Sequence, residues 1–583
     1  MERDHFDYVV VGGGTAGCVL ANRLSAEGRH RVLLLEAGPR DRSPWIHLPI
    51  GYGKTMFHKT LNWGFYTEPE PTMKDRRIYW PRGRTLGGSS SINGLIYIRG
   101  QAADYDHWAA LGNPGWSWKD VLPFFIRCEH NSRGPSATHG AEGPLSCSDI
   151  GVPHPLIEAI IAGAQDLGVP RTGDFNGGDQ EGVGYYQLFT RRGWRCSTAV
   201  AYLRPAARRP NLRVEVEAHA TELILDGRRA AGIRYRQGGA IREARAARAV
   251  ILAAGALQSP QLLLLSGIGP PDELARHGIP VRHALPGVGQ NLQDHLQVRL
   301  MYRVARAITT NDDLATLRGR ARIGLQWLLS RSGPLAVGIN QGGLFTRVMP
   351  GAGGPDIQFH FATLSADLAG AKPHPWSGCT FSVCQLRPES RGSVTLRSAD
   401  PFAAPVMRAN YLATETDRAC TVEGIKFARR LAATPALRDL LAEEHKPGAA
   451  VAGDAALLDF AQGSGATIFH PAGTCRMGDD PMAVTDARLR VHGLDGLRVV
   501  DCSIMPTLIS GNTSAPVVMI AEKASEMILA EARDEAVRGT DHVARSGAVE
   551  GASAHRVRDP ASSVPVAPLT PTLSRTGEGA RCG

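Results

Sequence analysis

The feature that most constrains this chain lies at its start, where three glycines separate a short apolar strand from a helix-like segment. The apolar run at residues 6–11 leads into Gly12, Gly14 and Gly17, and a second apolar run follows the helix-like segment. This order predicts a βαβ unit. In a G-x-G-x-x-G turn the first glycine permits the tight turn, the second lets the backbone approach a pyrophosphate, and the third lets the helix pack against the strand. We therefore expect a dinucleotide to bind here.

The residues around this turn indicate which dinucleotide binds. Thr15 and Ala16 lie in the glycine turn just before the helix-like segment at residues 18–24, and the unpaired N–H groups and partial positive charge of a helix N-terminus favour phosphate. Glu36 ends the second strand. A carboxylate at that place accepts hydrogen bonds from both hydroxyls of an adenosine ribose and repels a 2′-phosphate, which disfavours an NADP-type ligand. The position of the motif at the start of the chain, together with the motifs that follow, favours FAD over NAD.

Composition places the chain among globular proteins and excludes several other classes. Its 583 residues include 66 Gly and 38 Pro, with 43% apolar and 21% charged residues, which rules out a collagen, a coiled coil and a wholly disordered chain. The formal charge of +9 is dispersed and forms no long basic run, so nucleic acid is not an expected partner. The ten cysteines contain no C-x-x-C pair, and no metal site is expected.

Neither the start of the chain nor its apolar stretches predict export or membrane insertion. Only residues 1–5 precede the first strand, which leaves no room for a secretory signal. The most apolar later stretch, residues 249–265, is interrupted by polar residues and a proline, and it falls short of the roughly 20 apolar residues of a membrane span. These patterns predict a soluble, cytoplasmic protein without a transmembrane segment, and they leave a homo-oligomer open.

Four further motifs carry a resemblance to a known family. Residues 83–100 read GRTLGGSSSINGLIYIRG, and residues 255–269 read GALQSPQLLLLSGIG. Residues 468–478 read IFHPAGTCRMG, and residues 510–516 read SGNTSAP. Together these motifs resemble those of the glucose-methanol-choline (GMC) oxidoreductases, and the choline dehydrogenase-like branch most of all. The resemblance runs from about residue 6 to about residue 532.

The resemblance implies an α/β fold, with a Rossmann-like FAD-binding domain of the GMC type and a second α+β substrate domain built on an antiparallel sheet. Because the FAD motifs lie far apart in the chain, the FAD-binding domain is expected in three parts, at residues 1–155, 191–299 and 466–535. The substrate domain is expected at residues 156–190 and 300–465. Residues 536–583 show no apolar period and contain several prolines, which predicts a disordered tail.

Several elements are expected inside these parts. Short alternating segments with turns at residues 226–227 and 238–239 predict a β-meander over residues 212–250. Further strands are expected at residues 357–361, 379–384 and 392–396, and a helix at residues 416–433.

The resemblance also implies a set of residues that bind FAD. In the family, the region of Ala220 lies near the adenine, and the acid matching Asp501 lies by the pyrophosphate and the ribityl chain, although an acid there could instead cap a turn. The expected FAD-binding residues are Gly12, Gly14, Thr15, Ala16, Gly17, Glu36, Arg84, Gly87, Gly88, Ser90, Asn93, Gly94, Ala220, Ala254, Asp501 and Thr513.

One departure from the family pattern concerns how FAD is held. Some relatives attach FAD covalently through a histidine in the first signature, and this chain has Ile92 at that position. An alkyl side chain cannot form the bond. The sequence therefore predicts non-covalent, dissociable FAD.

His470 and Asn512 are the expected catalytic residues. In the family, the histidine matching His470 faces the flavin and acts on the substrate alcohol, and the position of Asn512 holds an Asn or a His. An alcohol carbon gives up hydride readily only while its hydroxyl is being deprotonated, which a neutral imidazole within reach can do. The amide of Asn512 can donate to the developing alkoxide, or it could serve only as a helix N-cap. The resemblance thus implies oxidation of an alcohol to the aldehyde, with hydride transfer to the flavin.

The substrate is the least constrained part of this prediction. Choline-using relatives carry a glutamate shortly before a Gly-Gly-Phe-type segment, whereas this chain has Asn340 and Gln341 in the comparable stretch. A neutral amide removes an attraction of roughly a few kcal/mol for a trimethylammonium group. An uncharged primary or aromatic alcohol is therefore expected, and choline is disfavoured.

Two other classes of function are compatible with the same motifs. One is a non-redox member of the family such as a hydroxynitrile lyase, and the other is a flavoprotein without catalysis. The presence of His470 argues against a photodecarboxylase, which departs from the family at that position. No motif specifies whether oxygen, a quinone or another carrier accepts the electrons.

Overall fold

The computed structural model describes residues 5–367 and 370–551, and it begins with the predicted βαβ unit. Strand β1 (His5–Val11), helix α1 (Thr15–Leu24) and strand β2 (Val32–Leu35) follow one another, and β1 pairs with β2 in parallel. Strand β2 is buried along its whole length, as an apolar strand inside a parallel sheet must be. Residues up to Met527 form one compact unit that contains both large sheets, and a second unit begins at Ile528.

The first sheet brings distant segments of the chain together. Its order is β10–β2–β1–β13–β12–β11, with β24 also paired to β13. Strands β11, β12 and β13 form the predicted antiparallel meander, and the end of β13 runs parallel beside β1. Strand β10 instead pairs with β2 at the sheet edge and does not join the meander. The bounds are β10 Leu212–Glu215, β11 His219–Asp226, β12 Arg229–Gln237, β13 Ala240–Leu252 and β24 Leu497–Val499.

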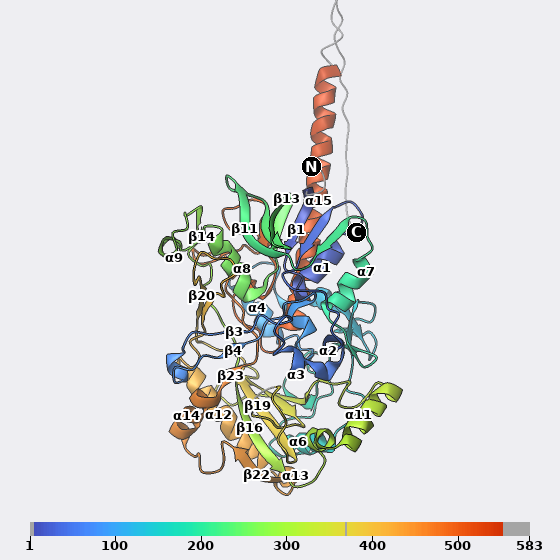
Figure 1. Ribbon diagram of the computed structural model, residues 1–583, viewed down its shortest axis with the longest axis vertical. Coiled ribbons are helices and arrows are strands. Elements are labelled where there is room, and N and C mark those ends of the chain that lie inside the picture. Colours follow the sequence, from blue (N-terminus) through green and yellow to red (C-terminus); the bar gives the residue numbers. More distant parts are fainter. Residues whose placement is uncertain (1–4, 368–369, 552–583) are drawn as a thin grey trace, which may run out of the picture. The chain divides into compact units, whose positions relative to one another are not determined.

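A second seven-stranded sheet lies at the opposite end of this unit (Figure 1). Its order is β22–β16–β19–β18–β17–β7, with β23 beside β16, and all of its neighbouring strands are antiparallel. The bounds are β7 Gly182–Tyr185, β16 Leu296–Val304, β17 Asn340–Thr346, β18 Ile357–Ala362, β19 Gly378–Gln385, β22 Leu441–Lys446 and β23 Ala466–Thr467. The predicted strand at residues 392–396 is β20 (Ser393–Thr395), which pairs with β21 (Val406–Arg408) outside this sheet.

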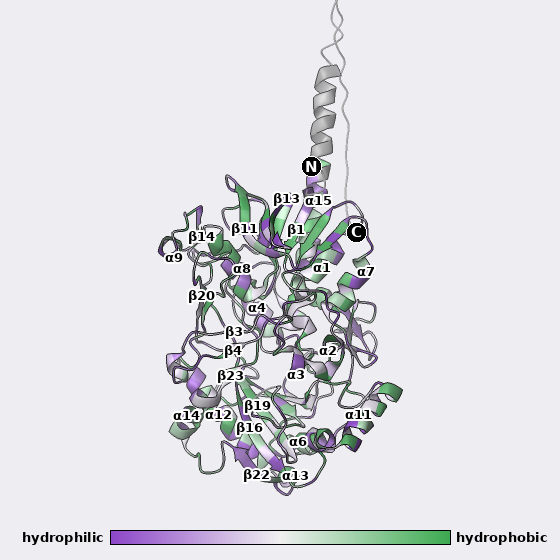
Figure 2. Cartoon of the chain, viewed as in Figure 1, coloured by the Kyte–Doolittle hydropathy of each residue, from purple (hydrophilic) through white to green (hydrophobic). Residues whose placement is uncertain are grey.

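The two faces of the second sheet differ in polarity because side chains alternate along each strand. One face carries Val298, Leu300, Phe359 and Phe381 among other apolar residues, which form a core with helices α6 (Pro155–Asp166) and α12 (Glu415–Ala432). Hydrophobic residues, shown in green in Figure 2, accordingly mark strands of both sheets. The other face carries a polar row in which Arg299 is in register with Ser382, and Ser382 with His360.

Helix α15 (Ser514–Gly551) begins at the predicted helix start, where the N–H of Val517 donates to the carbonyl of Thr513. It continues to Gly551, whereas the sequence predicted disorder from residue 536. Six Ala, Arg and Glu residues at positions 536–551 favour a helix, whereas three glycines in the same stretch disfavour it, so helix propensity alone does not account for the difference. Residues 552–583, the rest of the predicted tail, lie outside the described residues.

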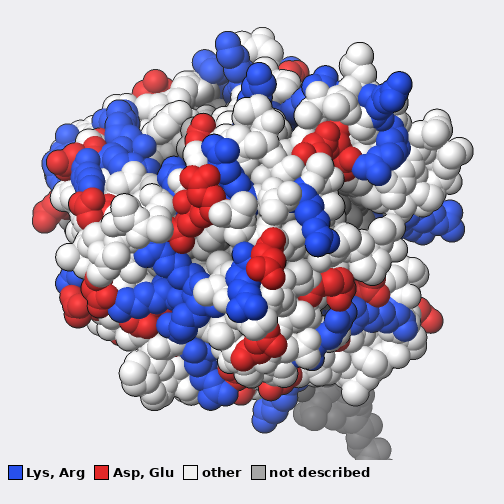
Figure 3. All heavy atoms as spheres, turned by 90° about the horizontal axis from the view of Figure 1, so that it is seen from below, with Lys and Arg blue, Asp and Glu red and all other residues white. Residues whose placement is uncertain are grey.

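Three properties of the described part of the chain bear on partners. Positive and negative side chains are interspersed over the face shown in Figure 3. The nine cysteines of this part are free thiols, and it contains no group of three or more His, Cys, Asp or Glu residues that could hold a metal ion. None of its helices combines the length and the apolar character that a bilayer crossing requires.

Candidate functional site

A cavity of about 310 Å³ is lined by residues from both sheets. Its wall includes the glycine turn after β1, the first part of the 83–100 motif, the start of helix α8 (Gly255–Leu265) and the polar face of the second sheet. Most of the predicted site residues lie on this wall. They are Gly12, Gly14, Thr15, Ala16, Glu36, Gly88, Ser90, Asn93, Gly94, Ala220, Ala254, His470, Asp501, Asn512 and Thr513.

Gly17, Gly87 and Arg84 do not line the cavity but support its wall. A Cβ on Gly17 would lie 1.8 Å from the carbonyl oxygen of Gly12, so only glycine lets α1 cross the turn this closely. The N–H of Gly87 donates to the carbonyl of Gly13 over 2.7 Å. The guanidinium of Arg84 lies 4.8 Å from the ring centre of Trp63, a residue that does line the cavity.

The glycine turn fits the pyrophosphate of a dinucleotide. No side chain caps the N-terminus of α1, so its first N–H groups are available to an anion. A Cβ built on Gly14 would have no neighbour closer than 3.9 Å, and this glycine faces the cavity. Gly88 closes the turn from the other side, because a Cβ there would lie 2.7 Å from the Cα of Gly14.

Glu36 is held by backbone groups in a way that leaves it free to bind a ribose. Its carboxylate accepts hydrogen bonds from the N–H of Gly13 over 2.9 Å and of Gly38 over 2.8 Å. Burial raises the pKa of Glu36 to about 7, although these two N–H groups and the charge of Arg84 oppose the rise. Each carboxylate oxygen keeps a second lone pair that can accept a hydroxyl.

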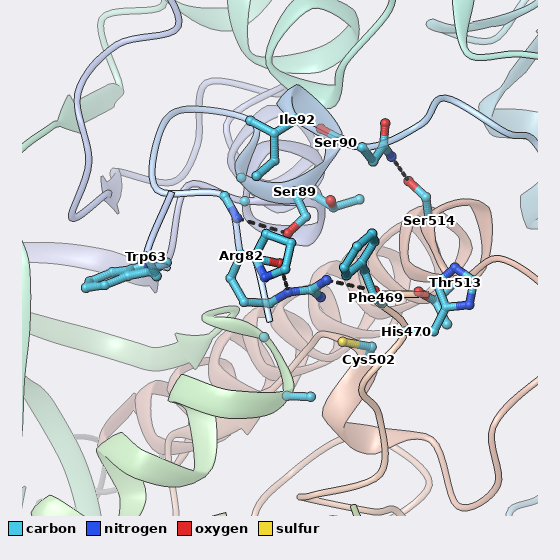
Figure 4. A pocket seen from close by; sticks show the side chains of 18 of the residues that line it. Trp63, Arg82, Ser89, Ser90, Ile92, Phe469, His470, Cys502, Thr513 and Ser514 are labelled. Atoms are coloured by element: carbon cyan, nitrogen blue, oxygen red, sulfur yellow. Dashed lines mark hydrogen bonds between the residues drawn. The ribbon is translucent and has the colours of Figure 1, made fainter. Parts of the chain in front are cut away.

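Arg195 stabilises the 83–100 motif through hydrogen bonds. One guanidinium nitrogen of Arg195 donates to Asn93 Oδ1 over 2.7 Å and to the carbonyl of Ser90 over 3.2 Å. Burial lowers the pKa of Arg195 to about 9. Ile92 lies on the cavity wall next to these residues, and Figure 4 shows it on the same segment as Ser89 and Ser90. The residue at the covalent attachment position is thus a buried alkyl group.

Asp501 caps two helical turns and also lines the cavity. One carboxylate oxygen accepts hydrogen bonds from the N–H of Gly255 over 2.8 Å and from Ser259 Oγ over 2.6 Å, at the start of α8. The other oxygen accepts from the N–H of Ser503 over 2.8 Å. The capping role, one of the two alternatives for this residue, is therefore present in the structure.

His470 and Asn512 come together on one side of the cavity. The Nδ2 atom of Asn512 lies 3.1 Å from Nε2 of His470, and Oδ1 of Asn512 accepts a hydrogen bond from Gln358 over 3.1 Å. Figure 4 shows His470 and Thr513 on the C-terminal segments and Arg82 and Ile92 on the N-terminal one. The amide orientation of Asn512 is thus set by Gln358, which leaves its NH₂ group to face the imidazole.

A second histidine, His295, determines which nitrogen of His470 carries the proton. Nε2 of His295 lies 2.9 Å from the carbonyl oxygen of Leu386, which can only accept, so this nitrogen carries a hydrogen. Nδ1 of a neutral His295 is then an acceptor, and it lies 3.0 Å from Nδ1 of His470. His470 therefore donates from Nδ1 and keeps a lone pair on Nε2. That lone pair faces Asn512.

Burial keeps this group of histidines neutral. Burial lowers the pKa of His470 well below its ordinary value, and the neighbouring His295, His360 and Arg82 add to the effect. Burial likewise lowers the pKa of His295 to about 4 and that of His360 to about 3, the latter opposed by the side chain of Asn512. An unprotonated Nε2 on His470 is the form that can accept a proton.

Several residues of this site were not singled out from the sequence. His295, Gln358, His360 and Arg299 all belong to strands of the second sheet or adjoin one. The available signal was a polar side chain at alternate positions of an otherwise apolar strand, as at Gln358 and His360. Of the two amides considered for substrate selection, Asn340 lines the cavity, whereas Gln341 is buried and donates to Thr363.

Comparison with known proteins identifies the family. The chain matches the GMC oxidoreductase family over residues 6–297 and 388–521. The chain belongs to the GMC oxidoreductases. It is 43% identical over 528 residues to an alcohol dehydrogenase [acceptor] of Pseudomonas putida, covering 90% of this chain and 96% of the relative. It is also 43% identical over 535 residues to the mitochondrial choline dehydrogenase of Mus musculus, covering 90% of each protein.

The solved structures agree with this assignment. Pyridoxine 4-oxidase from Mesorbium loti superposes with a TM-score of 0.81 at 32% sequence identity, covering 89% of this GMC oxidoreductase and 98% of that chain. Members of the family are FAD-dependent enzymes that act on CH–OH groups, and this chain is an FAD-binding oxidoreductase of the same kind. The family, the fold class and the cofactor predicted from the motifs are thereby confirmed.

Proposed function

We propose that this GMC oxidoreductase oxidises a primary alcohol to the aldehyde, with His470 as the base and Asn512 as the hydrogen-bond donor to the alcohol oxygen. The observation that carries the proposal is the contact of His470 Nε2 with Nδ2 of Asn512 at the cavity wall, together with the contact of its Nδ1 with His295, which leaves the lone pair on Nε2. General-base catalysis by a positioned imidazole contributes roughly 10²- to 10⁴-fold to a rate.

The chain's own residues would hold FAD without a covalent bond. Gly14 and the uncapped start of α1 fit the pyrophosphate, Glu36 fits the adenosine ribose, and the alkyl side chain of Ile92 offers no nucleophile. Helix α15 begins at the cavity wall, so the positive end of its dipole favours negative charge there. When bound, FAD supplies the redox chemistry by accepting the two electrons that leave the alcohol carbon.

The proton is handled by His470 and the groups behind it. A substrate hydroxyl that replaces the direct contact between the two side chains donates to Nε2 of His470 and accepts from Nδ2 of Asn512. His470 takes the hydroxyl proton at Nε2 and remains bonded through Nδ1–H to His295, which keeps the ring in one orientation. Asn512 cannot titrate, and Gln358 keeps its amide directed at the developing alkoxide.

The cavity chemistry supports an alcohol without a cationic head group. The described acidic residues on the cavity wall, Glu36 and Asp501, are the two that accept backbone N–H groups at the nucleotide-binding turns. The polar face of the second sheet presents Asn340, Gln297 and hydroxyl groups instead. A neutral primary or aromatic alcohol is therefore favoured over choline, even though several relatives are named choline dehydrogenases.

Anaerobic mixing with a panel of alcohols tests the proposal. The purified protein is mixed with primary, aromatic and polyol alcohols and with choline, while the absorbance of oxidised flavin is followed. We expect bleaching by a neutral primary or aromatic alcohol, and a rate lower by at least about 100-fold in His470→Ala at equal FAD content. No bleaching by any alcohol, with FAD bound, contradicts the proposal. Cleavage of a cyanohydrin under the same conditions would then identify a lyase.

A further inference from the structure

Arg299 lines the cavity on the side formed by the second sheet. It belongs to strand β16, two residues after Gln297 and therefore on the same polar face of the second sheet. Its register partner on β19 is Ser382, whose own partner on β18 is His360. Arg299, Ser382 and His360 all line the cavity. The positive side chain of Arg299 thus lies in the same cross-strand row as His360, which is one of the buried histidines around His470.

The guanidinium of Arg299 has few partners in the described part of the chain. Its hydrogen bond there is from Nη2 to the carbonyl of Ala366, over 3.3 Å, although a guanidinium carries five N–H donors. No carboxylate of the described residues lies within ion-pair distance. Asp367 acts on Arg299 from farther away, and its carboxylate is exposed and pairs with His374 over 3.4 Å.

Partial burial without a nearby anion raises the free energy of the charged Arg299 guanidinium. Burial lowers the pKa of Arg299, with Tyr52 and Asp367 opposing the shift, yet an arginine stays protonated at neutral pH. A partly buried positive charge without a bonded anion loses hydration and gains little in return. An anion bound on the cavity side would offset this cost.

Neighbouring residues complete a site for a carboxylate. Tyr52, on helix α3 (Tyr52–Thr55), lines the cavity, and burial raises its pKa to about 12, so its hydroxyl is a neutral donor. Ser382, the register partner of Arg299, adds a hydroxyl group on the same wall. A planar guanidinium binds a carboxylate through two parallel hydrogen bonds, which a phenol can supplement.

We propose that the substrate of this enzyme carries a carboxylate besides its reacting hydroxyl, and that Arg299 binds this carboxylate. This inference rests on the proposed alcohol oxidation and keeps the exclusion of a cationic head group, but it replaces the neutral substrate with an anionic one. Adjacent strands lie about 4.8 Å apart, so the Cα atoms of Arg299 and His360, two strands apart, are separated by roughly 10 Å. His360 acts electrostatically on His470 and therefore lies near it. A hydroxymethyl group at His470 and a carboxylate at Arg299 then suit a compact hydroxy acid, such as a hydroxymethyl-substituted aromatic acid.

A matched substrate series separates this inference from the proposed function. The series comprises 4-(hydroxymethyl)benzoate, its neutral methyl ester, 4-methylbenzyl alcohol and the cationic 4-(aminomethyl)benzyl alcohol. We expect kcat/KM to be at least about tenfold higher for the carboxylate than for the ester, and lowest for the cation. In Arg299→Met we expect kcat/KM for the carboxylate to fall about 10- to 100-fold, mainly through KM, with the neutral alcohols little changed.

The control is Arg303→Met, because Arg303 lies on the same strand but is exposed, pairs with Glu443 and does not line the cavity. Oxidation of the carboxylate and the ester at equal kcat/KM overturns the inference while leaving alcohol oxidation intact. Loss of FAD, or an equal loss for all substrates, in Arg299→Met also overturns it. If Arg299→Met does not fold, inhibition of the wild-type enzyme tests the inference instead. We expect 4-methylbenzoate to inhibit more strongly than the neutral 4-methylbenzamide. Equal inhibition by the two compounds refutes the inference.

Discussion

At the scale of single residues, the site depends on a sequence of hydrogen bonds in which each partner fixes the next. The carbonyl of Leu386 sets the tautomer of His295, and His295 sets that of His470. Gln358 sets the amide of Asn512. A base needs a free lone pair in a defined direction as much as it needs a suitable pKa. His295 is therefore a positioning residue that acts through His470.

Replacement of His295 tests this role. In His295→Phe, His470 loses its Nδ1 partner, and we expect kcat to fall about tenfold or more, whereas His295→Gln, which can accept from Nδ1–H, keeps more of the rate. The pH dependence of kcat/KM gives a second readout. The pKa of His470 is lowered in the native site, so activity should persist as the pH falls through 6.5 and be lost only below it. An unchanged rate and pH profile in His295→Phe would contradict a positioning role.

At the scale of elements, the sequence predicts best where the signal is local. The β1–α1–β2 unit follows from adjacent residues, since apolar periods and glycine geometry lie within one short segment. The placement of β10 and β20 was missed because a strand's partner depends on segments far away in the chain. The pairing of His295 with His470, 175 residues apart, was missed for the same reason. No local pattern encodes that contact.

Gly14 offers a test of the βαβ element that separates cofactor binding from folding. Its φ of −79° suits alanine, and the added Cβ would meet no protein atom within 3.9 Å, so Gly14→Ala should fold normally. The methyl group would occupy the cavity wall where the pyrophosphate fits. We expect FAD content to fall at least about tenfold, measured by absorbance after gel filtration, because displaced hydrogen bonds to phosphate cost roughly 2 kcal/mol.

The control for this experiment is Gly324→Ala in helix α11 (Leu317–Ser330), because the added Cβ also meets nothing within 4 Å there and Gly324 does not line the cavity. That change should leave FAD content intact and slightly stabilise the helix, by about 1 kcal/mol. Equal FAD content in the two variants would show that the backbone at Gly14 does not approach the cofactor.

At the scale of the whole molecule, the cavity wall is assembled from segments spread over most of the first compact unit. Residues near positions 12, 90, 220, 255, 299, 360, 470 and 513 all contribute to it. A ligand that contacts all of these segments binds only while they are folded together. FAD binding and the stability of this unit are therefore thermodynamically linked.

Removal and return of FAD measure this linkage and the mode of attachment together. Acid precipitation should release all of the FAD into the supernatant, because Ile92 provides no bond to it. The refolded or salt-stripped apoprotein should have a lower Tm than the holoenzyme, and free FAD at 100 times its Kd should restore about 2.7 kcal/mol. AMP, which fits only the Glu36 end, should restore less. FAD retained on the precipitate, or a Tm that does not respond to added FAD, would contradict dissociable binding across the two sheets.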